Sequence, residues 1–134
     1  MALNSMQEIF EKAASRSIPF WRVVLETDME ERQVTEEQSM EKMRATWHAM
    51  LESVISYQGD QRSRSGLVGG DGAQMRRYAA ADTTYSGPYV QEVIATALSV
   101  GESNACMRKI VAAPTAGACG VLPAVCLLYT SPSP

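Results

Sequence analysis

The stretch that most constrains the fold is residues 110–128, IVAAPTAGACGVLPAVCLL, which is apolar at nearly every position. A membrane-spanning helix of this length needs an unbroken apolar run. This run is interrupted by four residues of other kinds, Pro114, Gly117, Gly120 and Pro123. We therefore expect the end of one buried helix, a tight Pro-Thr-Ala-Gly turn and a second buried helix, all within a protein core.

The Pro-Thr-Ala-Gly turn is a candidate anion site. A turn that begins a helix leaves backbone N–H groups without partners, and the hydroxyl of Thr115 would lie beside them. A carboxylate or a phosphate can bind such groups. Glycines that only let two helices pack closely produce the same pattern, so the residues alone leave both interpretations open.

Length and composition favour one helical domain without a membrane anchor. The chain has 134 residues, of which 46% are hydrophobic and 20% charged, enough for a packed core. The net charge of −3 argues against nucleic acid as a partner. The acidic, amphipathic N-terminus lacks the apolar region of a signal peptide, and the three cysteines are an odd number. We expect a protein of the reducing cytoplasm.

Helix signals occur along the whole chain. A first helix is expected over residues 5–14, and Ser17 is expected to cap a second, with Pro19 near its first turn. The sequence TEEQ at 35–38 matches a capping box and predicts a third helix that ends before Gly59. His48 falls on the polar face of this helix, so a surface histidine is favoured over a general base.

The second half of the chain continues this helical pattern. Residues 73–81 predict a short helix, and Pro88 predicts the first turn of another that Gly101 closes. Its apolar face would be Val90, Val93, Ile94, Ala97 and Leu98. Ser103 or Asn104 would cap the helix after it. No segment alternates with period two, so we predict an all-α fold with glycine-rich loops between helices.

Residues 59–72, GDQRSRSGLVGGDG, form a glycine-rich break between helices. No Gly-Lys-Ser/Thr follows it and no strand precedes it, so neither a Walker loop nor a dinucleotide fingerprint fits. A surface linker is one interpretation. The apolar pair Leu67–Val68 instead indicates that the segment packs onto something and is not a free linker.

Three separated motifs together resemble one known family. They are SGLVGGDG at 65–72, YSGP at 85–88 and NACMRKIVAAPTAGACGVLPA at 104–124. In this order they are similar to the alpha chain, or alpha domain, of the bacterial iron-sulfur L-serine dehydratases. The resemblance covers roughly residues 4–128, so we interpret residues 1–128 as the N-terminal portion of that domain, truncated at its C-terminus. We interpret the Ser/Pro tail, residues 129–134, as non-native sequence.

The resemblance implies deamination of L-serine to pyruvate and ammonia without pyridoxal phosphate. In that family a [4Fe-4S] cluster, one iron of which is not held by cysteine, acts as a Lewis acid on the substrate hydroxyl. The resemblance also implies a partner beta domain or beta chain and a homo- or hetero-oligomer when complete. Two alternatives remain: a related lyase acting on another small amino acid such as cysteine, and a non-catalytic helical interaction module.

Two departures limit what is carried over from the family. Its cluster-ligating cysteines lie downstream of these residues, and the spacings between Cys106, Cys119 and Cys126 do not match a compact ligand set. We therefore expect buried, inert thiols and assign no metal ligand, and the fragment is expected to be inactive alone. Where the family usually has Met-Gly-Arg, this chain has Met107-Arg108-Lys109.

The candidate substrate-binding residues come from all three motifs, and no catalytic base is assigned. The substrate carboxylate would be bound at the turn by Thr115, Ala116 and Gly117. The glycine-rich bend would face that turn and form a second wall from Ser65, Gly66, Gly69, Gly70 and Asp71. Further donors would be Ser86, Gly87 and Asn104.

Each polar candidate also has a plainer interpretation. Asp71 would accept from the substrate ammonium, or else cap the following helix. Helix capping explains Ser86, Gly87 and Asn104 equally well. Arg62 and Arg64 would attract a carboxylate substrate, or else be ordinary solvated side chains.

Overall fold

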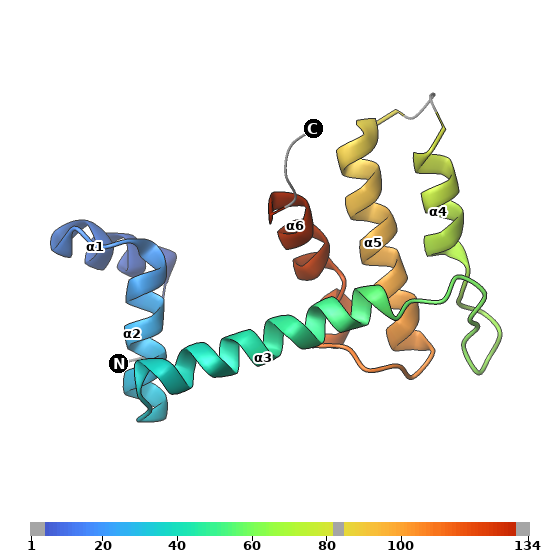
Figure 1. Cartoon of the computed structure of the whole chain (residues 1–134). Coiled ribbons are helices and arrows are strands. Elements are labelled where there is room, and N and C mark those ends of the chain that lie inside the picture. Colours follow the sequence, from blue (N-terminus) through green and yellow to red (C-terminus); the bar gives the residue numbers. More distant parts are fainter. Residues whose placement is uncertain (1–4, 82–84, 131–134) are drawn as a thin grey trace. The chain divides into compact units, whose positions relative to one another are not determined.

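A computed structural model describes residues 5–81 and 85–130, which form helices joined by loops (Figure 1). The chain divides into two compact units, Met1–Thr46 and Trp47–Pro134, and each is described by itself. The described residues contain no strand, so the predicted all-α class is confirmed. The elements are α1 (Met6–Arg16), α2 (Phe20–Arg32), α3 (Glu36–Ile55), α4 (Asp71–Ala79), α5 (Gly87–Ala105), the short 3-10 helix η1 (Ala116–Ala118) and α6 (Val121–Thr130).

Local capping chemistry sets the helix starts in the N-terminal unit. The Ser5 hydroxyl accepts from the backbone N–H of Glu8 at the start of α1. The capping box of α3 is confirmed in both directions: Gln38 N–H donates to Thr35 Oγ1 (3.3 Å), and Thr35 N–H donates to Gln38 Oε1 (3.0 Å). Each of these bonds satisfies a backbone N–H that a helix start otherwise leaves free.

The predicted role of Ser17 as the cap of the second helix is wrong. Ser17 ends α1 in the left-handed conformation (φ 52°), and its N–H bonds back to the carbonyls of Ala13 and Ala14. Only three residues join α1 to α2, so a left-handed residue is needed to turn the chain. Pro19, which has no N–H to satisfy, occupies the position before α2 instead.

Charged side chains join the three helical segments of the N-terminal unit. Arg22 pairs with Glu26 (3.2 Å) and with Glu36 at the start of α3 (2.8 Å). Arg16 also pairs with Glu26 (2.6 Å). These contacts hold a small unit in which few large apolar side chains are fully buried.

In the C-terminal unit, α5 lies between α4 and α6 and packs against both (Figure 1). Two glycines allow this close packing. A Cβ on Gly72 would lie 2.6 Å from Ser99 Oγ, and a Cβ on Gly120 would lie 2.2 Å from the carbonyl oxygen of Ala97. The packing interpretation of the glycines in residues 110–128 therefore holds for Gly120. It does not hold for Gly117, where a Cβ would make only one ordinary contact, with Thr115 Oγ1 at 3.9 Å.

The buried face of α5 differs from the apolar face expected for it. Val90, Ile94 and Leu98 remain 38–49% exposed. The buried residues are mostly small or polar: Gln91, Ala95, Thr96, Ser99, Val100, Glu102 and Ser103. Close approach of α4 and α6 requires small side chains at the contact, which explains why the sequence periodicity identified the wrong face.

The end of α5 also lies later than expected. Gly101 does not close the helix, which continues to Ala105, so Ser103 and Asn104 lie in its last turn and cap no new helix. The Arg108 N–H donates to the Ser103 carbonyl (2.9 Å), and Met107 takes the left-handed conformation (φ 61°). This is the hydrogen-bond pattern of a helix C-terminus, here with methionine where glycine is usual.

The last helix, α6, extends beyond the native portion proposed from the sequence. Tyr129 and Thr130, assigned above to a Ser/Pro tail, are its final residues. Residues 131–134, the rest of that proposed tail, lie outside the described residues. Within the ranges 5–81 and 85–130, no helix is both long enough and apolar enough to cross a lipid bilayer.

Candidate functional site

Two of the three sequence motifs meet the C-terminal end of α5. We call residues 59–72 the glycine bend and residues 113–117 the proline turn. Gln61 Nε2, in the bend, donates to Ser103 Oγ (3.2 Å), and Asn104 Nδ2 donates to the carbonyl of Ala116 in the turn (3.1 Å). The two motifs are thus attached to consecutive residues of one helix end.

The two segments lie on neighbouring faces of α5. Ser99 contacts Gly72, and Ser103, one turn later, contacts the glycine bend. The Cys119 thiol donates to the Val100 carbonyl (3.8 Å) on the next face. Successive residues of an α-helix are about 100° apart, so these faces adjoin. No hydrogen bond joins bend to turn in the part of the chain that the structure describes, and their facing one another stays a prediction.

The start of α4 is held by Glu102, a residue that the sequence interpretation missed. Glu102 Oε1 accepts from the N–H groups of Asp71 (2.5 Å) and Gly72 (3.1 Å), and its Oε2 accepts from the Tyr57 hydroxyl (2.6 Å). The Tyr57 oxygen in turn accepts from the N–H of Ala73 (3.1 Å). Burial, and then the hydrogen bond to Glu102, raise the pKa of Tyr57, so the phenol keeps its proton and donates.

This arrangement excludes one of the two interpretations of Asp71, that it caps the helix. Gly70, in the left-handed region (φ 87°), occupies the N-cap position without any side-chain cap bond, and Asp71 is the first helical residue. The prediction that Asp71 caps this helix is therefore wrong, because Glu102 on α5 accepts from the first N–H groups of α4. The Asp71 side chain is exposed, and it makes no hydrogen bond or ion pair with the other described residues.

Arg62 lies against the two glycines that precede α4. Its Nη1 donates to the Gln61 carbonyl (2.8 Å), and a Cβ on Gly70 would lie 2.8 Å from that same nitrogen. A Cβ on Gly69 (φ 139°) would lie 2.2 Å from the Gln61 carbonyl oxygen. Glycine is thus required at both positions by backbone conformation and by space. Within residues 5–81 and 85–130, Arg62 forms no ion pair.

Ser65 and Gly66 form the exposed tip of the glycine bend. Ser65 Oγ contacts Ser63 Oγ (3.1 Å) and accepts from the Leu67 N–H (3.4 Å), so its described bonds are local. Leu67 is 88% exposed, so the predicted packing of the Leu67–Val68 pair is wrong for Leu67. Gly66 takes a left-handed conformation (φ 76°), which supports the sharp turn.

The proline turn leaves its polar groups accessible. Thr115, Ala116 and Gly117 are exposed, and the Thr115 side chain makes no cap bond to η1. The N–H of Ala118 donates to the Thr115 carbonyl (3.1 Å). A helical turn leaves its first N–H groups without partners inside the helix, here those of Ala116 and Gly117.

The remaining motif, YSGP at 85–88, lies at the start of α5 and cannot share a small pocket with the two motifs at the other end of that helix. Ser86 and Gly87 precede or begin this helix, whereas Asn104 is in its last turn. At about 1.5 Å per residue, Gly87 and Asn104 are roughly 25 Å apart along the axis. Ser86 instead accepts a hydrogen bond from the amide of the buried Gln91. We therefore remove Ser86 and Gly87 from the candidate site.

The three cysteines do not fit an iron-sulfur ligand set. Cys119 is buried, and burial raises the pKa of its thiol, which favours the protonated form over the thiolate that metals require. The expectation that Cys106 and Cys126 are buried is wrong, because both are only half-buried. The described residues contain no group of three or more His, Cys, Asp or Glu placed to hold a metal ion. His48 is exposed on α3, as expected.

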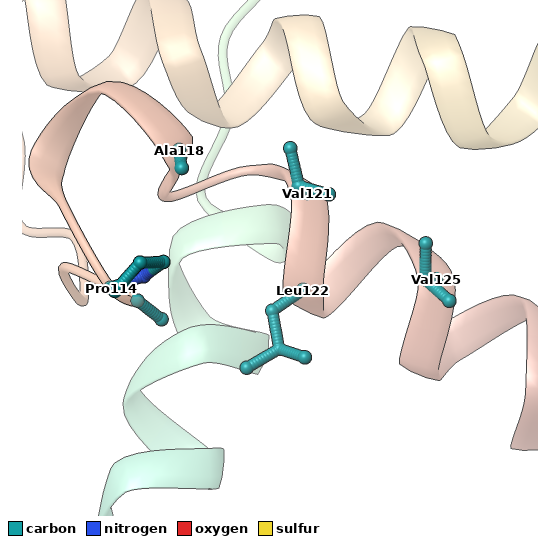
Figure 2. A pocket seen from close by; sticks show the side chains of 6 residues that line it. Pro114, Ala118, Val121, Leu122 and Val125 are labelled. Carbon is teal, nitrogen blue, oxygen red and sulfur yellow. The ribbon is translucent and has the colours of Figure 1, made fainter. Parts of the chain in front are cut away.

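A groove of about 630 Å³ beside the proline turn is too apolar to bind a carboxylate (Figure 2). Its walls come from both sides of η1 and carry only alkyl side chains: Ala113, Pro114, Ala118, Val121, Leu122 and Val125. A small zwitterion needs charged or hydrogen-bonding partners when it leaves water. The candidate site is therefore the polar end of α5 and not this groove.

The chain belongs to the family described as "Serine dehydratase alpha chain", whose model matches residues 15–132. The match continues past residue 128, where we had placed the end of the family-like sequence.

Two curated relatives support this assignment. The "L-serine dehydratase, alpha chain" of Peptoniphilus asaccharolyticus is 32% identical over 130 residues, which is 96% of this chain and 44% of that protein. The "Probable L-serine dehydratase, alpha chain" of Bacillus subtilis (strain 168) is 29% identical over 120 residues, 90% of this chain and 40% of that protein. The chain thus spans less than half the length of these relatives. No solved structure matches it.

Proposed function

We propose that this chain is part of an L-serine dehydratase that converts L-serine to pyruvate and ammonia, and that the glycine bend and the proline turn bind the substrate. Family membership supports the reaction class. The observation that carries the site is the pair of hydrogen bonds from Gln61 to Ser103 and from Asn104 to Ala116, which attach both segments to one helix end.

The polar groups left free in the two segments suit a hydroxylated amino acid. Thr115 offers a hydroxyl, and Ala116 and Gly117 offer backbone N–H groups, to the substrate carboxylate. Asp71, which is exposed and has no side-chain partner among the described residues, accepts from the ammonium group. Ser65, Gly66, Gly69, Gly70 and Asn104 complete the proposed walls.

The proposal includes a [4Fe-4S] cluster and excludes pyridoxal phosphate, on the resemblance alone. Because Cys106, Cys119 and Cys126 do not fit a ligand set, the cluster would be held by other residues of the complete enzyme. We further propose a beta chain or beta domain as partner, an oligomeric enzyme, and a cytoplasmic location. The 134-residue chain would then be inactive alone.

The test is pyruvate formation from L-serine by the complete alpha chain carrying these residues, assembled with its beta partner. Asp71→Asn and Thr115→Ala should each lower kcat/KM by roughly 10- to 100-fold, the effect of losing a charge-assisted hydrogen bond. The exposed His48→Ala is the matched control and should retain activity. Full activity in both site variants would refute the proposed site.

Two further measurements separate the alternatives. Faster turnover of L-cysteine than of L-serine would favour the related lyase. A 134-residue chain that co-purifies with a defined protein, while the complete protein turns over neither amino acid, would favour the interaction module. Pyruvate formation by the 134-residue chain, after reconstitution with iron and sulfide, would contradict its proposed inactivity.

A further inference from the structure

The N-terminus of α4 already holds an anion, supplied by the protein itself. A helix start is a general anion site, because its first N–H groups are free and its dipole is positive there. In this chain the N–H groups of Asp71 and Gly72 both donate to Glu102 Oε1, at 2.5 and 3.1 Å. A substrate carboxylate would find these donors occupied.

The Glu102 carboxylate is well fixed in this position. It is 3% exposed, and its second oxygen accepts from Tyr57, which also accepts from the Ala73 N–H. A buried carboxylate is tolerated when its oxygens are hydrogen-bonded, and here both are. The glycine bend is therefore attached to α5 through a side chain that comes from 30 residues further along the chain.

Charges of both signs lie close to this helix start. The dipole contributes about half a positive charge at the helix N-terminus, and Glu102 and Asp71 each bring a full negative charge. Two cations lie nearby: the Arg62 guanidinium lies against Gly70, and the Arg76 guanidinium lies 6.0 Å from the centre of the Tyr57 ring. The bend thus carries the Asp71 carboxylate and the Arg62 guanidinium, opposite charges that are complementary to those of an amino acid zwitterion.

We propose that Glu102 is a positioning residue: it occupies the anion site of α4 from within, so that the bend presents Asp71 to the substrate ammonium instead of backbone N–H groups to the substrate carboxylate. Tyr57 holds Glu102 in place. The substrate part of this inference rests on the proposed function, whereas the occupied helix start does not.

The first test asks whether Glu102 fills the anion site. Amide hydrogen exchange of the 134-residue chain should show Asp71 and Gly72 protected, and formate should not shift their NMR signals. Glu102→Ala should lose at least tenfold in protection, and formate should restore it by entering the vacated site. Glu102→Gln, which keeps an acceptor oxygen, should stay protected. Glu92→Ala, on the same helix, is the matched control and should behave as wild type.

The second test asks whether Glu102 sets the preference for an ammonium group. The readout is the ratio of Kd values for 3-hydroxypropanoate, which lacks the amino group, and L-serine, from NMR titrations of the glycine bend. Wild type should prefer L-serine. Glu102→Gln should reduce this ratio by roughly fivefold to tenfold, because one negative charge near the ammonium is lost. If Glu102 had only a structural role, Glu102→Gln would weaken the binding of both ligands equally and leave the ratio of their Kd values unchanged.

The outcomes separate the inference from the function on which it rests. Unchanged exchange in Glu102→Ala, or formate binding at Asp71 and Gly72 in wild type, overturns the occupied anion site. An L-serine preference that persists in Glu102→Gln overturns the positioning role alone. If L-serine leaves the signals of the wild-type bend unchanged, the substrate part of the inference fails, whereas pyruvate formation by the complete enzyme decides the proposed function. If Glu102→Ala does not fold, Tyr57→Phe replaces it and should lower the protection of Ala73 and Gly72; unchanged protection overturns the cap.

Discussion

The contact between α4 and α5 allows one prediction to be worked from the structure. A Cβ on Gly72 would lie 2.6 Å from Ser99 Oγ and 3.0 Å from both Ser99 Cα and Ser99 N, where ordinary contacts are 3.4–4 Å. Two of these three atoms are backbone, so rotation of a side chain cannot relieve the overlap. In Gly72→Ala, α4 has to move away from α5 by roughly 0.4–1 Å.

The expected cost follows from two opposing effects. Overpacking of this kind costs about 1–3 kcal/mol. Alanine stabilises the folded helix by about 0.5 kcal/mol relative to glycine, because glycine loses more backbone entropy on folding. Gly72→Ala should therefore lower the free energy of unfolding by about 0.5–2.5 kcal/mol. It should also weaken the hydrogen bonds that Glu102 on α5 accepts from the N–H groups of Asp71 and Gly72 on α4, because these bonds join the same two helices.

Gly101→Ala is the matched control, since it makes the same chemical change within α5. A Cβ there meets nothing within 4 Å, and Gly101 is not in the left-handed region. This variant should gain about 0.5–1 kcal/mol. Urea unfolding followed by far-UV circular dichroism measures both variants against wild type. A Gly72→Ala chain as stable as Gly101→Ala would refute the reasoning about close approach.

Three further predictions concern single side chains. Met107→Gly should raise the free energy of unfolding by about 1 kcal/mol, because the left-handed conformation is costly for methionine and the exposed side chain (89%) loses little packing. Urea unfolding measures this change, and an unchanged urea midpoint would contradict the prediction. The pKa of Tyr57 is raised in the folded chain, so the stability that its protonated phenol contributes is complete below the ordinary tyrosine pKa of 10.0 and is lost as the pH rises through the higher folded pKa. Tyr57→Phe should therefore flatten the decline in unfolding free energy above about pH 10. A parallel decline in both chains would exclude Tyr57 as the origin of the decline. Alkylation followed by mass spectrometry should modify Cys106 and Cys126 before the buried Cys119, and early modification of Cys119 would contradict its burial.

Two helix starts, those of α3 and α5, could be predicted from the sequence because their causes are local. The capping box at Thr35 and Gln38 and the proline in the first turn of α5 each involve residues within one turn of each other. Such signals act before any tertiary contact forms. The all-α class followed from the same signals.

The cap of α4 could not be predicted this way because its partner is remote in sequence. The sequence indicates Asp71 as the cap, yet Gly70 occupies that position, and Glu102 on α5 accepts from the first N–H groups of α4. One signal was available: Glu102 is a charged residue on the helix face that carries Ser99 and Ser103, where a buried charge needs partners. Periodicity alone assigned the large apolar side chains of α5 to the core and so identified the wrong face.

The candidate site was predicted only in part. The glycine bend and the proline turn do meet the same end of α5, through Gln61 and Asn104. Ser86 and Gly87 came from an equally family-like motif, but the length of α5 separates them from that end. The distance between two motifs on one helix can be predicted only when both helix ends are known, and α5 continues past the predicted end at Gly101 to Ala105.

The most direct test of one site shared by both segments is an NMR titration of the isotope-labelled chain with L-serine. The account predicts that amide signals of Asp71 in the glycine bend and of Thr115 to Gly117 in the proline turn shift together, with one Kd. Shifts in a single segment, or two different Kd values, would contradict a site made by both.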